Sequence, residues 1–578
     1  MSVKVVPRAI ESFRVESLGY FVILFSRLCR RKIVYGTGCT SEAELIDVFR
    51  ALCLILNSYS YLPIDTYAPL HTCRSTHLPF HPIHPSYPAI HALRHCRRYR
   101  KEVASISETL NHDTMTPLHP DNLHQLAPGT KILFATVPAD GHVNPLTGLA
   151  VYLKSVGCDV RWYTSTKYQK KIDGMGIPFY PLVKALDLGA DNIEEVFADR
   201  ENYKSMVGKL NYDLTHVFVK RGPEYFEDIK AIYTDFPFEV MIADLTFTAM
   251  PMVKEVMGIP VIAGGIIPLT ENSTDLPPAG LGMTPSDSAL GRIKQDVLRF
   301  VANRFLFASS NKALKEMLAT YGIETLNTNI FDVLTKKATL LLQSGTPSFE
   351  YKRSDKGHNI RFVGPLLPYS PGAKSEWYHP KLAQYDKVIL VTQGTVEKDS
   401  EKLIVPTLEA FKDTNCLVVV ATGGSNTEAL RTRFPQQNFI IEDFIPFNSV
   451  MPHVDVYVTN GGYGGVLLGI QNGLPMVVAG VHEGKSEICA RVGYFKLGIN
   501  LRTEKPTAKQ IRKSVEEVLE DGAFKLRVLK LRKEFARYET GPLCASHIAG
   551  VLNRKHKKTI HPQPLKSSIS AQKPVAVY

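Results

Sequence analysis

Residues 457–465 read YVTNGGYGG, a run that ends at Asn460 and is followed by glycine at four of the next five positions. Short apolar runs such as the one before Asn460 are typical of buried strands in parallel sheets. Glycine after such a strand lets the main chain approach a phosphate, and the N–H groups that open the next helix donate hydrogen bonds to it. The stretch therefore predicts a buried strand, a pyrophosphate-binding loop and a helix over 463–472. A tight strand–helix turn without a ligand is the alternative explanation.

Two more loops in the same half of the chain have this composition. Gln393-Gly394-Thr395 and Gly423-Gly424-Ser425 each follow an apolar run and precede a helical pattern. In open parallel sheets, ligands bind beyond the carboxyl ends of the strands, where such loops lie. Three glycine-containing loops favour a phosphate site more strongly than one does. Neither first strand is followed by GxGxxG with an acidic residue beyond it, which disfavours an NAD-dependent dehydrogenase.

Apolar runs alternate with amphipathic helical patterns on both sides of a polar interruption at 351–359. The runs before it lie at 131–137, 159–164, 240–244 and 260–264, and those after it lie at 387–395, 416–424, 438–446, 454–462 and 475–480. This alternation predicts an α/β fold with two doubly wound, Rossmann-like parallel sheets, each covered by helices on both faces.

Four regions are expected along the chain. They are a largely non-core, poorly ordered extension at 1–127, an N-terminal domain at 128–355, a C-terminal domain at 356–553 and a basic disordered tail at 554–578. Within the extension, the segment from His71 to His95 is rich in histidine and proline, a composition that can bind metal. Its histidines have no regular ligand spacing, so we favour the non-core interpretation.

The formal net charge of the 578 residues is +12, but it is unevenly distributed. Residues 1–127 carry +4 and residues 553–578 carry +6, which leaves about +2 for the segment between them. A segment this close to neutral is not expected to present a basic binding face. We therefore expect no nucleic-acid partner.

The cysteines and the hydropathy pattern both indicate a cytoplasmic protein. Five of the nine cysteines fall in the first 96 residues and none forms a CxxC pair, as expected for free thiols in a reducing compartment. No apolar run reaches the roughly 18–20 residues that span a bilayer. The run from Tyr20 to Cys29 is short, is interrupted by Arg27 and makes a poor signal peptide. We expect no stable membrane insertion.

Residues 443–501, from DFIPFNSV to YFKLGINL, resemble the donor-binding signature of inverting nucleotide-sugar glycosyltransferases with the GT-B fold. The resemblance is greatest to the macrolide-type branch related to UDP-glucosyltransferases, and it extends over residues 130–552. It implies two Rossmann-like domains facing across a cleft. It also implies transfer of a hexosyl group from a UDP- or dTDP-sugar to a hydroxyl of a lipophilic small molecule. The metal-binding DxD motif of the other glycosyltransferase fold is absent, so no metal cofactor is expected.

The resemblance assigns the donor-binding residues. The family's His-Gly-Gly-x-x-Ser block has Asn460 at the histidine position and Gly465 at the serine position, and its sugar-reading Asp-Gln pair aligns with Gly484-Lys485. Asparagine can donate a neutral hydrogen bond to a diphosphate but brings no positive charge. Lys485 is either the compensating charge or a solvated surface lysine. The expected donor-binding residues are Gln393, Gly394, Thr395, Phe444, Ile445, Asn460, Gly461, Gly462, Gly464, Gly465, Glu483 and Lys485, with the nucleobase near 444–447.

The loop after the first apolar run reads PADGHVNP over residues 138–145. We expect Asn144 to cap a helix over 145–156, with Pro145 in its first turn and His142 just upstream. A hydroxyl that attacks an anomeric carbon in one inverting step must lose its proton, and a positioned histidine is the commonest base. The family places its catalytic histidine in this loop. On spacing alone, His142 is equally well explained as an ordinary loop histidine.

Asp244 ends an expected strand over 239–243 and matches the carboxylate that orients the histidine in the family. An aspartate in this position is otherwise often a helix N-cap. Because both residues lie where the resemblance requires them, we favour a catalytic dyad of His142 and Asp244.

The loop from Gly264 to Gly282 is rich in turn-forming residues and is expected to border the acceptor cleft. Phe218, Tyr225 and Phe226 are candidates for aromatic walls of that cleft, and core packing explains each of them equally well. Two rival functions remain open. A nucleotide-sugar epimerase would need no acceptor, and a catalytically silent sugar-nucleotide-binding protein would accommodate the changes at Asn460 and Gly484-Lys485.

Overall fold

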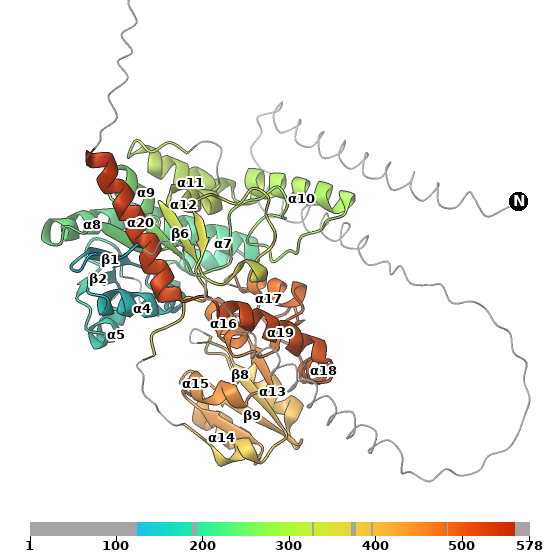
Figure 1. Ribbon diagram of the computed structural model, residues 1–578. Helices are drawn as coiled ribbons and strands as arrows, with labels where there is room; N and C mark the ends of the chain where they lie inside the picture. Colours follow the sequence, from blue (N-terminus) through green and yellow to red (C-terminus); the bar gives the residue numbers. More distant parts are fainter. Residues whose placement is uncertain are drawn as a thin grey trace, which may run out of the picture. The chain divides into compact units, whose positions relative to one another are not determined.

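The computed structural model describes residues 124–187, 193–325, 329–370, 377–394, 397–482 and 484–560 (Figure 1). Residues 1–123 of the expected N-terminal extension, including the histidine-rich segment, lie outside this range. Within the described residues, the strands form two parallel sheets, one of seven strands and one of six. The predicted α/β fold class with two doubly wound sheets is thereby confirmed.

The first sheet has the strand order β3-β2-β1-β4-β5-β6-β7. Its strands are β1 Lys131–Ala135, β2 Asp159–Thr164, β3 Phe179–Pro181, β4 Val240–Asp244, β5 Val261–Gly265, β6 Leu340–Gln343 and β7 Ile360–Phe362. The helices between them are α4 Asp140–Ser155, α5 Gln169–Gly174, α6 Ile193–Val196, α7 Met206–Asp213, α8 Gly222–Asp235, α9 Met250–Glu255, α10 Ala289–Val301, α11 Ala308–Ala319 and α12 Ile330–Lys337. All four apolar runs predicted in this half form strands; β3, β6 and β7 are additional.

The second sheet has the strand order β10-β9-β8-β11-β12-β13. Its strands are β8 Lys387–Thr392, β9 Cys416–Ala421, β10 Phe439–Glu442, β11 Val456–Thr459, β12 Met476–Val478 and β13 Gly498–Asn500. Its helices are α13 Ile404–Phe411, α14 Thr427–Arg433, α15 Phe447–Val450, α16 Tyr463–Gln471, α17 Lys485–Tyr494, α18 Ala508–Glu520 and α19 Gly522–Phe535, followed by α20 Thr540–Ile560. The five apolar runs predicted in this half all form strands, and only β13 was not expected.

Continuous apolar runs form the central strands because both faces of each sheet are covered. In β1, Leu133 packs into one hydrophobic cluster, whereas Ile132 and Phe134 pack into a second cluster on the opposite face. In β8, Leu390 and Ile389 divide between two clusters in the same way. All five side chains are fully buried. This two-sided burial brings the carboxyl ends of the strands, and the polar loops that follow, to one edge of each sheet.

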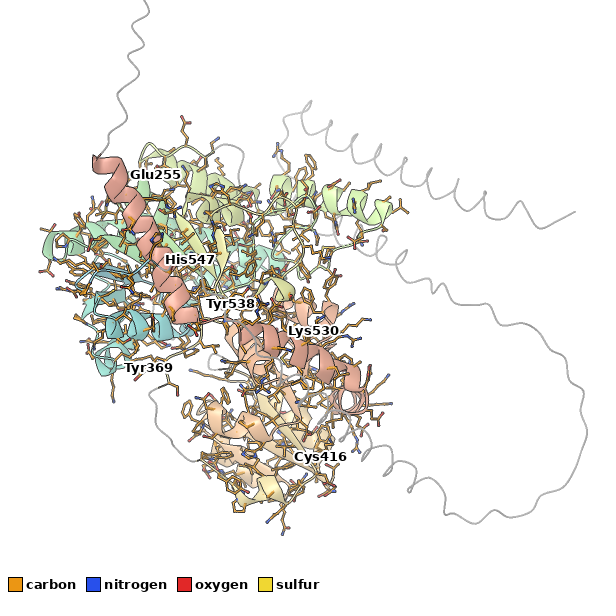
Figure 2. All side chains as sticks on the ribbon, in the orientation of Figure 1. Glu255, Tyr369, Cys416, Lys530, Tyr538 and His547 are labelled. Carbon is orange, nitrogen blue, oxygen red and sulfur yellow. The ribbon has the colours of Figure 1, made fainter. Side chains whose placement is uncertain are left out.

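The expected domain boundary at residues 355 and 356 does not match the first sheet. β7, at Ile360–Phe362, pairs in parallel with β6, so the first sheet continues past the boundary. The chain also returns at its C-terminal end, where Leu543 and Ile548 of α20 join the hydrophobic cluster that contains α4. Figure 2 labels His547 on α20 and Tyr538 just before it. The helix therefore contributes to the core of the N-terminal half, although it follows the second sheet in sequence.

Helix α20 continues to Ile560, past residue 554 where the disordered tail is expected to start, and the rest of that tail lies outside the described residues. Apolar residues that include Val551 and Leu552 anchor this helix to the first sheet's cluster. In the part of the chain that the structure describes, no helix is both long and apolar enough to cross a membrane.

Candidate active site

His142 lies inside the first turn of α4, not upstream of the helix as expected. The helix begins at Asp140 with Ala139 as its N-cap, and the N–H groups of His142 and Val143 both donate to the Ala139 carbonyl, at 2.9 and 3.0 Å. Pro145 lies in the helix interior, and its ring is buried. The expectation relied on the preference of proline for the first turn. Only one helical hydrogen bond is lost at Pro145, and burial of the ring helps to offset that loss.

The imidazole of His142 contacts a carboxylate and a hydroxyl. Its Nδ1 lies 3.0 Å from Oδ1 of Asp244, at the end of β4, and 3.1 Å from Oγ1 of Thr246. An ionised carboxylate can only accept hydrogen bonds, so Nδ1 carries the proton and the lone pair of the neutral ring is on Nε2. His142 is partly exposed, at 18 %, whereas Asp244 is fully buried. The contact fixes the orientation of the ring and leaves Nε2 as the nitrogen that can accept a proton.

Asp244 is held as a carboxylate by its surroundings. Its Oδ2 accepts a hydrogen bond from the N–H of Val137 at 2.8 Å, and its Oδ1 accepts from the N–H and hydroxyl of Thr246 at 2.9 and 2.5 Å. Burial alone would raise the pKa of Asp244. The charge interaction and hydrogen bond with His142, followed by the bonds from Thr246 and Val137, outweigh burial and lower that pKa below its usual value. The group therefore remains an anion at neutral pH.

The N-cap explanation for Asp244 is not the one observed. The next helix, α9, begins only at Met250, and Asp244 accepts locally from the N–H of Thr246 in a tight turn. Thr246 was missed by the sequence interpretation. An Asp-x-Thr spacing after a strand is a signal for this kind of turn. Nothing in that spacing indicates that the hydroxyl also reaches His142.

The three aromatic candidates have different environments. Tyr225 and Phe226 of α8 are 2 % and 1 % exposed and belong to the main hydrophobic cluster of the first sheet, so the core explanation holds for both. Phe218, at the end of the π-helical segment Leu214–Phe218, is half-buried, and its ring centroid lies 6.3 Å from that of His142. Phe218 is therefore the aromatic residue of the three that borders the imidazole.

The glycine loop at 460–462 connects β11 to α16, whose bounds closely match the helix expected over 463–472. Gly461 has a φ of +80°, and a Cβ added there would lie 2.3 Å from Sγ of Cys489. Both the backbone conformation and the close contact require glycine. A Cβ on Gly464 would meet no atom within 4 Å, so that glycine faces open space. The loop thus presents main chain at the start of a helix, the arrangement that binds anions.

The polar side chains of this edge are directed into the protein. The Nδ2 of Asn460 donates to the main-chain carbonyl of Gln393, and both residues are buried. The Oε1 of Gln393 accepts from the N–H groups of Leu403 and Ile404, each at 2.9 Å, at the start of α13. Gly394 adjoins Asn460. The side-chain amide of Asn460 therefore joins the ends of β11 and β8, and that of Gln393 joins the end of β8 to the start of α13. Main-chain groups are then what this edge offers to a ligand.

The other expected donor residues are distributed around this edge. Phe444 is 72 % exposed and its ring lies beside Gly424, whereas Ile445 is buried. Lys485 is the first residue of α17, and its Cβ lies 3.1 Å from a Cβ added on Gly480, which in turn would touch the carbonyl of Asn460. Lys485 is therefore next to the glycine loop. Thr395 and Glu483 lie outside the described residues.

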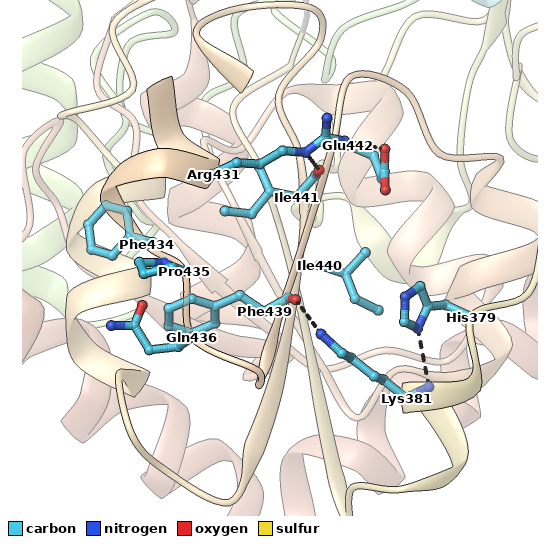
Figure 3. Close-up of a pocket in the computed structure, with 10 residues that line it drawn as sticks. All are labelled: His379, Lys381, Arg431, Phe434, Pro435, Gln436, Phe439, Ile440, Ile441 and Glu442. Carbon is cyan, nitrogen blue, oxygen red and sulfur yellow. Dashed lines mark hydrogen bonds and ion pairs between the residues drawn. The ribbon is translucent and has the colours of Figure 1, made fainter. Parts of the chain in front are cut away.

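A hollow lies at the edge of the second sheet, beside β10 and away from the glycine loop (Figure 3). Its lining includes two cations that cover the open edge of β10: Nζ of Lys381 donates to the carbonyl of Phe439 at 3.2 Å, and Nε of Arg431 donates to that of Ile441 at 2.8 Å. Side chains that satisfy outward carbonyls protect an edge strand from pairing with another chain. None of the expected site residues lines this hollow. Among the residues that the structure describes, no group of three or more His, Cys, Asp or Glu is arranged to hold a metal ion.

Comparison with known proteins gives consistent findings. Residues 407–544 match the family described as erythromycin biosynthesis protein CIII-like, C-terminal domain. The chain is 34% identical over 409 residues to the 4'-demethylrebeccamycin synthase of Lentzea aerocolonigenes, covering 71% of this chain and 96% of that protein. It is 31% identical over 428 residues to UDP-glycosyltransferase 2 of Phaeomoniella chlamydospora, covering 70% of this chain and 92% of that protein. A crystal structure of the glycotransferase of kitacinnamycin has a similar fold, with a TM-score of 0.58 at 19% identity over 74% of this chain and all of that one.

Proposed function

The chain belongs to the EryCIII-like, UDP-glucosyltransferase-related family of nucleotide-sugar glycosyltransferases, and on that premise we propose that it is an inverting enzyme. It transfers a hexosyl group from a UDP- or dTDP-sugar to a hydroxyl of a lipophilic small molecule. The observation that carries this proposal is the 3.0 Å contact between Nδ1 of His142 and Oδ1 of the fully buried Asp244. A partly exposed imidazole that is oriented by a buried carboxylate can act as a general base.

In the proposed reaction, Nε2 of His142 accepts the proton of the acceptor hydroxyl. The hydroxyl oxygen attacks the anomeric carbon, and its new bond to that carbon forms as the bond from the carbon to the diphosphate oxygen breaks. The nucleoside diphosphate leaves with the electron pair of the broken bond. Asp244 stabilises the imidazolium that results, because it is an anion held by the bonds of Thr246 and Val137. One displacement of this kind inverts the anomeric configuration.

The donor half supports the leaving group through its main chain. The loop at 460–462 and the first N–H groups of α16 would bind the diphosphate, with Gly464 leaving room beside it. Lys485 would supply the positive charge that an asparagine at position 460 cannot. The exposed ring of Phe444 offers a surface for the nucleobase.

Two further assignments belong to the proposal. The lipophilic acceptor is supported by the half-buried Phe218 beside His142 and by the name of one relative, 4'-demethylrebeccamycin synthase. We also place the reaction in the cytoplasm, since Cys158, Cys489 and Cys544 are buried free thiols of the kind that a reducing compartment maintains.

The direct experiment measures release of UDP or dTDP from a panel of sugar nucleotides, with and without a panel of phenolic and polycyclic aglycones. We expect release that requires an aglycone, and a loss of about 10²–10⁴-fold in kcat for His142→Ala with donor binding retained. A matched control is His547→Ala on α20, a histidine of the same half outside the proposed site. Release without any aglycone would favour an epimerase or hydrolase, and unchanged turnover in His142→Ala would remove the proposed base.

A further inference from the structure

Helix α17 contacts the glycine loop of the donor half. A Cβ added on Gly461 would lie 2.3 Å from Sγ of Cys489 and 3.9 Å from the carbonyl oxygen of Lys485, so the first two turns of α17 pack directly against the loop. Cys489 is fully buried there. A ligand that shifts the loop therefore acts on this helix, because packed interiors leave little room for independent movement.

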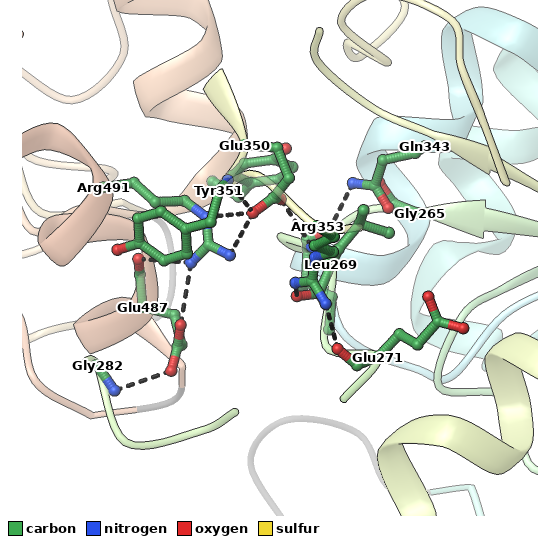
Figure 4. Close-up of polar contacts among 12 residues, drawn as sticks. Gly265, Leu269, Glu271, Gly282, Gln343, Glu350, Tyr351, Arg353, Glu487 and Arg491 are labelled. Atoms are coloured by element: carbon green, nitrogen blue, oxygen red, sulfur yellow. Dashed lines mark hydrogen bonds and ion pairs between the residues drawn. The ribbon is translucent and has the colours of Figure 1, made fainter. Parts of the chain in front are cut away.

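The same helix holds the loop that we expect to border the acceptor. Oε1 of Glu487 accepts hydrogen bonds from the N–H groups of Gly280 and Gly282, at 2.9 and 2.8 Å, and Figure 4 shows the bond from Gly282. Both glycines belong to the segment that follows β5. Because β5 pairs with β4 through Gly264 and Asp244, this segment leaves the sheet beside the catalytic carboxylate. Glu487 thus connects the donor helix to the acceptor side of the molecule.

Buried charges orient Glu487. Its Oε2 lies 3.0 Å from Nη1 of Arg491, one turn along α17, and Arg491 is 1 % exposed. Nε and Nη2 of Arg491 both donate to Oε1 of Glu350, at 2.9 and 2.5 Å, and the guanidinium lies 4.3 Å from the ring centroid of Tyr351. The other oxygen of Glu350 accepts from the N–H of Leu269 at 3.0 Å. The network therefore holds the acceptor loop near its start, at Leu269, and near its end, through Glu487.

The close approach of the acceptor loop to α17 requires glycine at Gly282. Gly280 and Gly282 have φ values of +87° and +62°, and a Cβ on Gly282 would lie 2.7 Å from Cβ of Ser486 and 3.0 Å from its main-chain carbon. A side chain there would push the loop away from the first turn of α17. Gly322 has a similar φ of +69°, but a Cβ on it would meet no atom within 4 Å. The chain thus offers a control with the same backbone strain and no contact.

We propose that Glu487 is a positioning residue through which occupation of the donor loop at 460–462 sets the position of the acceptor loop at 264–282. The inference rests on the proposed function, since it requires a nucleotide at the glycine loop. Linkage makes the effect reciprocal: nucleotide binding tightens the acceptor loop, and an ordered acceptor loop tightens nucleotide binding by the same factor. The consequence for catalysis is that the acceptor site is completed only when the donor is bound.

The first test needs no ligand. Amide hydrogen exchange of the full chain is followed in peptides covering 276–284, for the wild type and Glu487→Gln. An amide side chain cannot accept from the two glycines and from Arg491 at once, so we expect exchange at 280–282 to become about tenfold faster. Glu516→Gln on α18, which breaks an exposed one-turn ion pair with Arg512, is the matched control and should leave these peptides unchanged. Equal exchange in Glu487→Gln and the wild type would show that Glu487 does not hold the acceptor loop at Gly280 and Gly282.

The second test adds UDP or dTDP at saturating concentration. In the wild type, we expect protection to rise both at 460–466 and at 276–284; in Glu487→Gln, only the rise at 460–466 should remain. Once an acceptor is known, its KM should rise about tenfold in the variant, with little change in the KM of the donor. A rise at 276–284 that persists in the variant contradicts the coupling. If neither nucleotide protects 460–466, the proposed function and the coupling both fail. The ligand-free test still decides whether Glu487 holds the acceptor loop.

Gly282→Ala alters the contact between the acceptor loop and α17 on the loop side, whereas Glu487→Gln alters it on the helix side. It should reproduce the faster exchange at 276–284 and the loss of nucleotide response, because the added methyl group displaces the loop from Ser486. Gly322→Ala should change neither, apart from a small loss of thermal stability due to its φ. If the two glycine variants behave alike, backbone strain alone explains the effect and the contact with α17 does not couple the loops.

Discussion

The two halves of the proposed site use the chain in different ways. On the acceptor side, chemistry is carried by side chains: the imidazole of His142 is oriented by a buried carboxylate and a hydroxyl. On the donor side, the polar side chains of Asn460 and Gln393 bind their own main chain, and peptide groups face the space for a ligand. A functional group that must transfer a proton requires one residue type. A surface that binds an anion through N–H groups requires a backbone conformation instead.

The difference predicts opposite sensitivities to substitution. On the acceptor side, an isosteric change of a single polar atom should lower kcat, by up to about 10³-fold, and leave the fold intact. On the donor side, polar changes should have moderate effects, and the addition of a methyl group to a crowded glycine should be severe.

The largest effect is expected for Asp244→Asn. An amide cannot stabilise the imidazolium by charge, and its NH₂ group competes with Nδ1–H for the same space. We expect kcat to fall about 10³-fold, with nucleotide affinity unchanged, as measured by steady-state turnover and by calorimetric titration with UDP or dTDP. A loss of nucleotide affinity comparable to the loss in kcat would mean that Asp244 also supports donor binding. It would contradict the division between a catalytic acceptor side and a nucleotide-binding donor side.

Next in size is Gly461→Ala. The methyl group would meet Sγ of Cys489 at a φ of +80°, so we expect a loss of stability of about 2 kcal/mol or more together with loss of nucleotide binding. Gly464→Ala, with open space around it, should fold like the wild type and weaken nucleotide binding alone. Thermal melts and nucleotide titrations of the two variants separate these outcomes. Equal melting temperatures would contradict the crowding at Gly461.

A smaller effect is expected for Thr246→Val. The variant keeps the shape of the residue but loses the hydroxyl that contacts both Asp244 and His142. We expect kcat to fall about tenfold and the KM of the donor to stay constant. Thr248→Val, whose hydroxyl bonds the carbonyl of Phe218 instead of the dyad, is the neighbouring control. The same loss of kcat in both variants would show that Thr246 acts only through local packing.

The smallest effect concerns acid stability. The pKa of Asp244 is lower in the folded chain than the usual 3.8, so its stabilisation is present above about pH 4 and is lost as pH falls through the folded-state value. Asp244→Asn lacks this contribution at every pH. The gap in melting temperature between wild type and variant should therefore narrow between pH 7 and pH 3. A gap that stays constant over this range would mean that Asp244 is not held as an anion by His142 and Thr246.

The sequence was informative where local pattern and function coincide. The apolar runs predicted the central strands because both faces of each sheet are buried, and the glycines after Asn460 predicted the loop and the start of α16. The pairing of His142 with Asp244, 102 residues apart, came from a resemblance and not from spacing.

The features that were missed depend on packing between distant segments. The return of α20 to the first sheet joins residues that are hundreds of positions apart, so no local pattern marks it. Helix α4 begins at Asp140 in spite of Pro145, because the proline ring is buried. The side chain of Asn460 turns toward the Gln393 carbonyl, a partner that exists only once β8 and β11 are neighbours. Glu487 and Thr246 gain their roles in the same way, from groups that folding brings within reach.

The most direct test of the central account is the anomeric configuration of the product formed from an α-linked sugar nucleotide such as UDP-α-glucose. A base that activates the acceptor for one displacement predicts a β-glycoside, identified by the large H1–H2 coupling in its NMR spectrum. An α-glycoside would contradict the single displacement and the role proposed for His142.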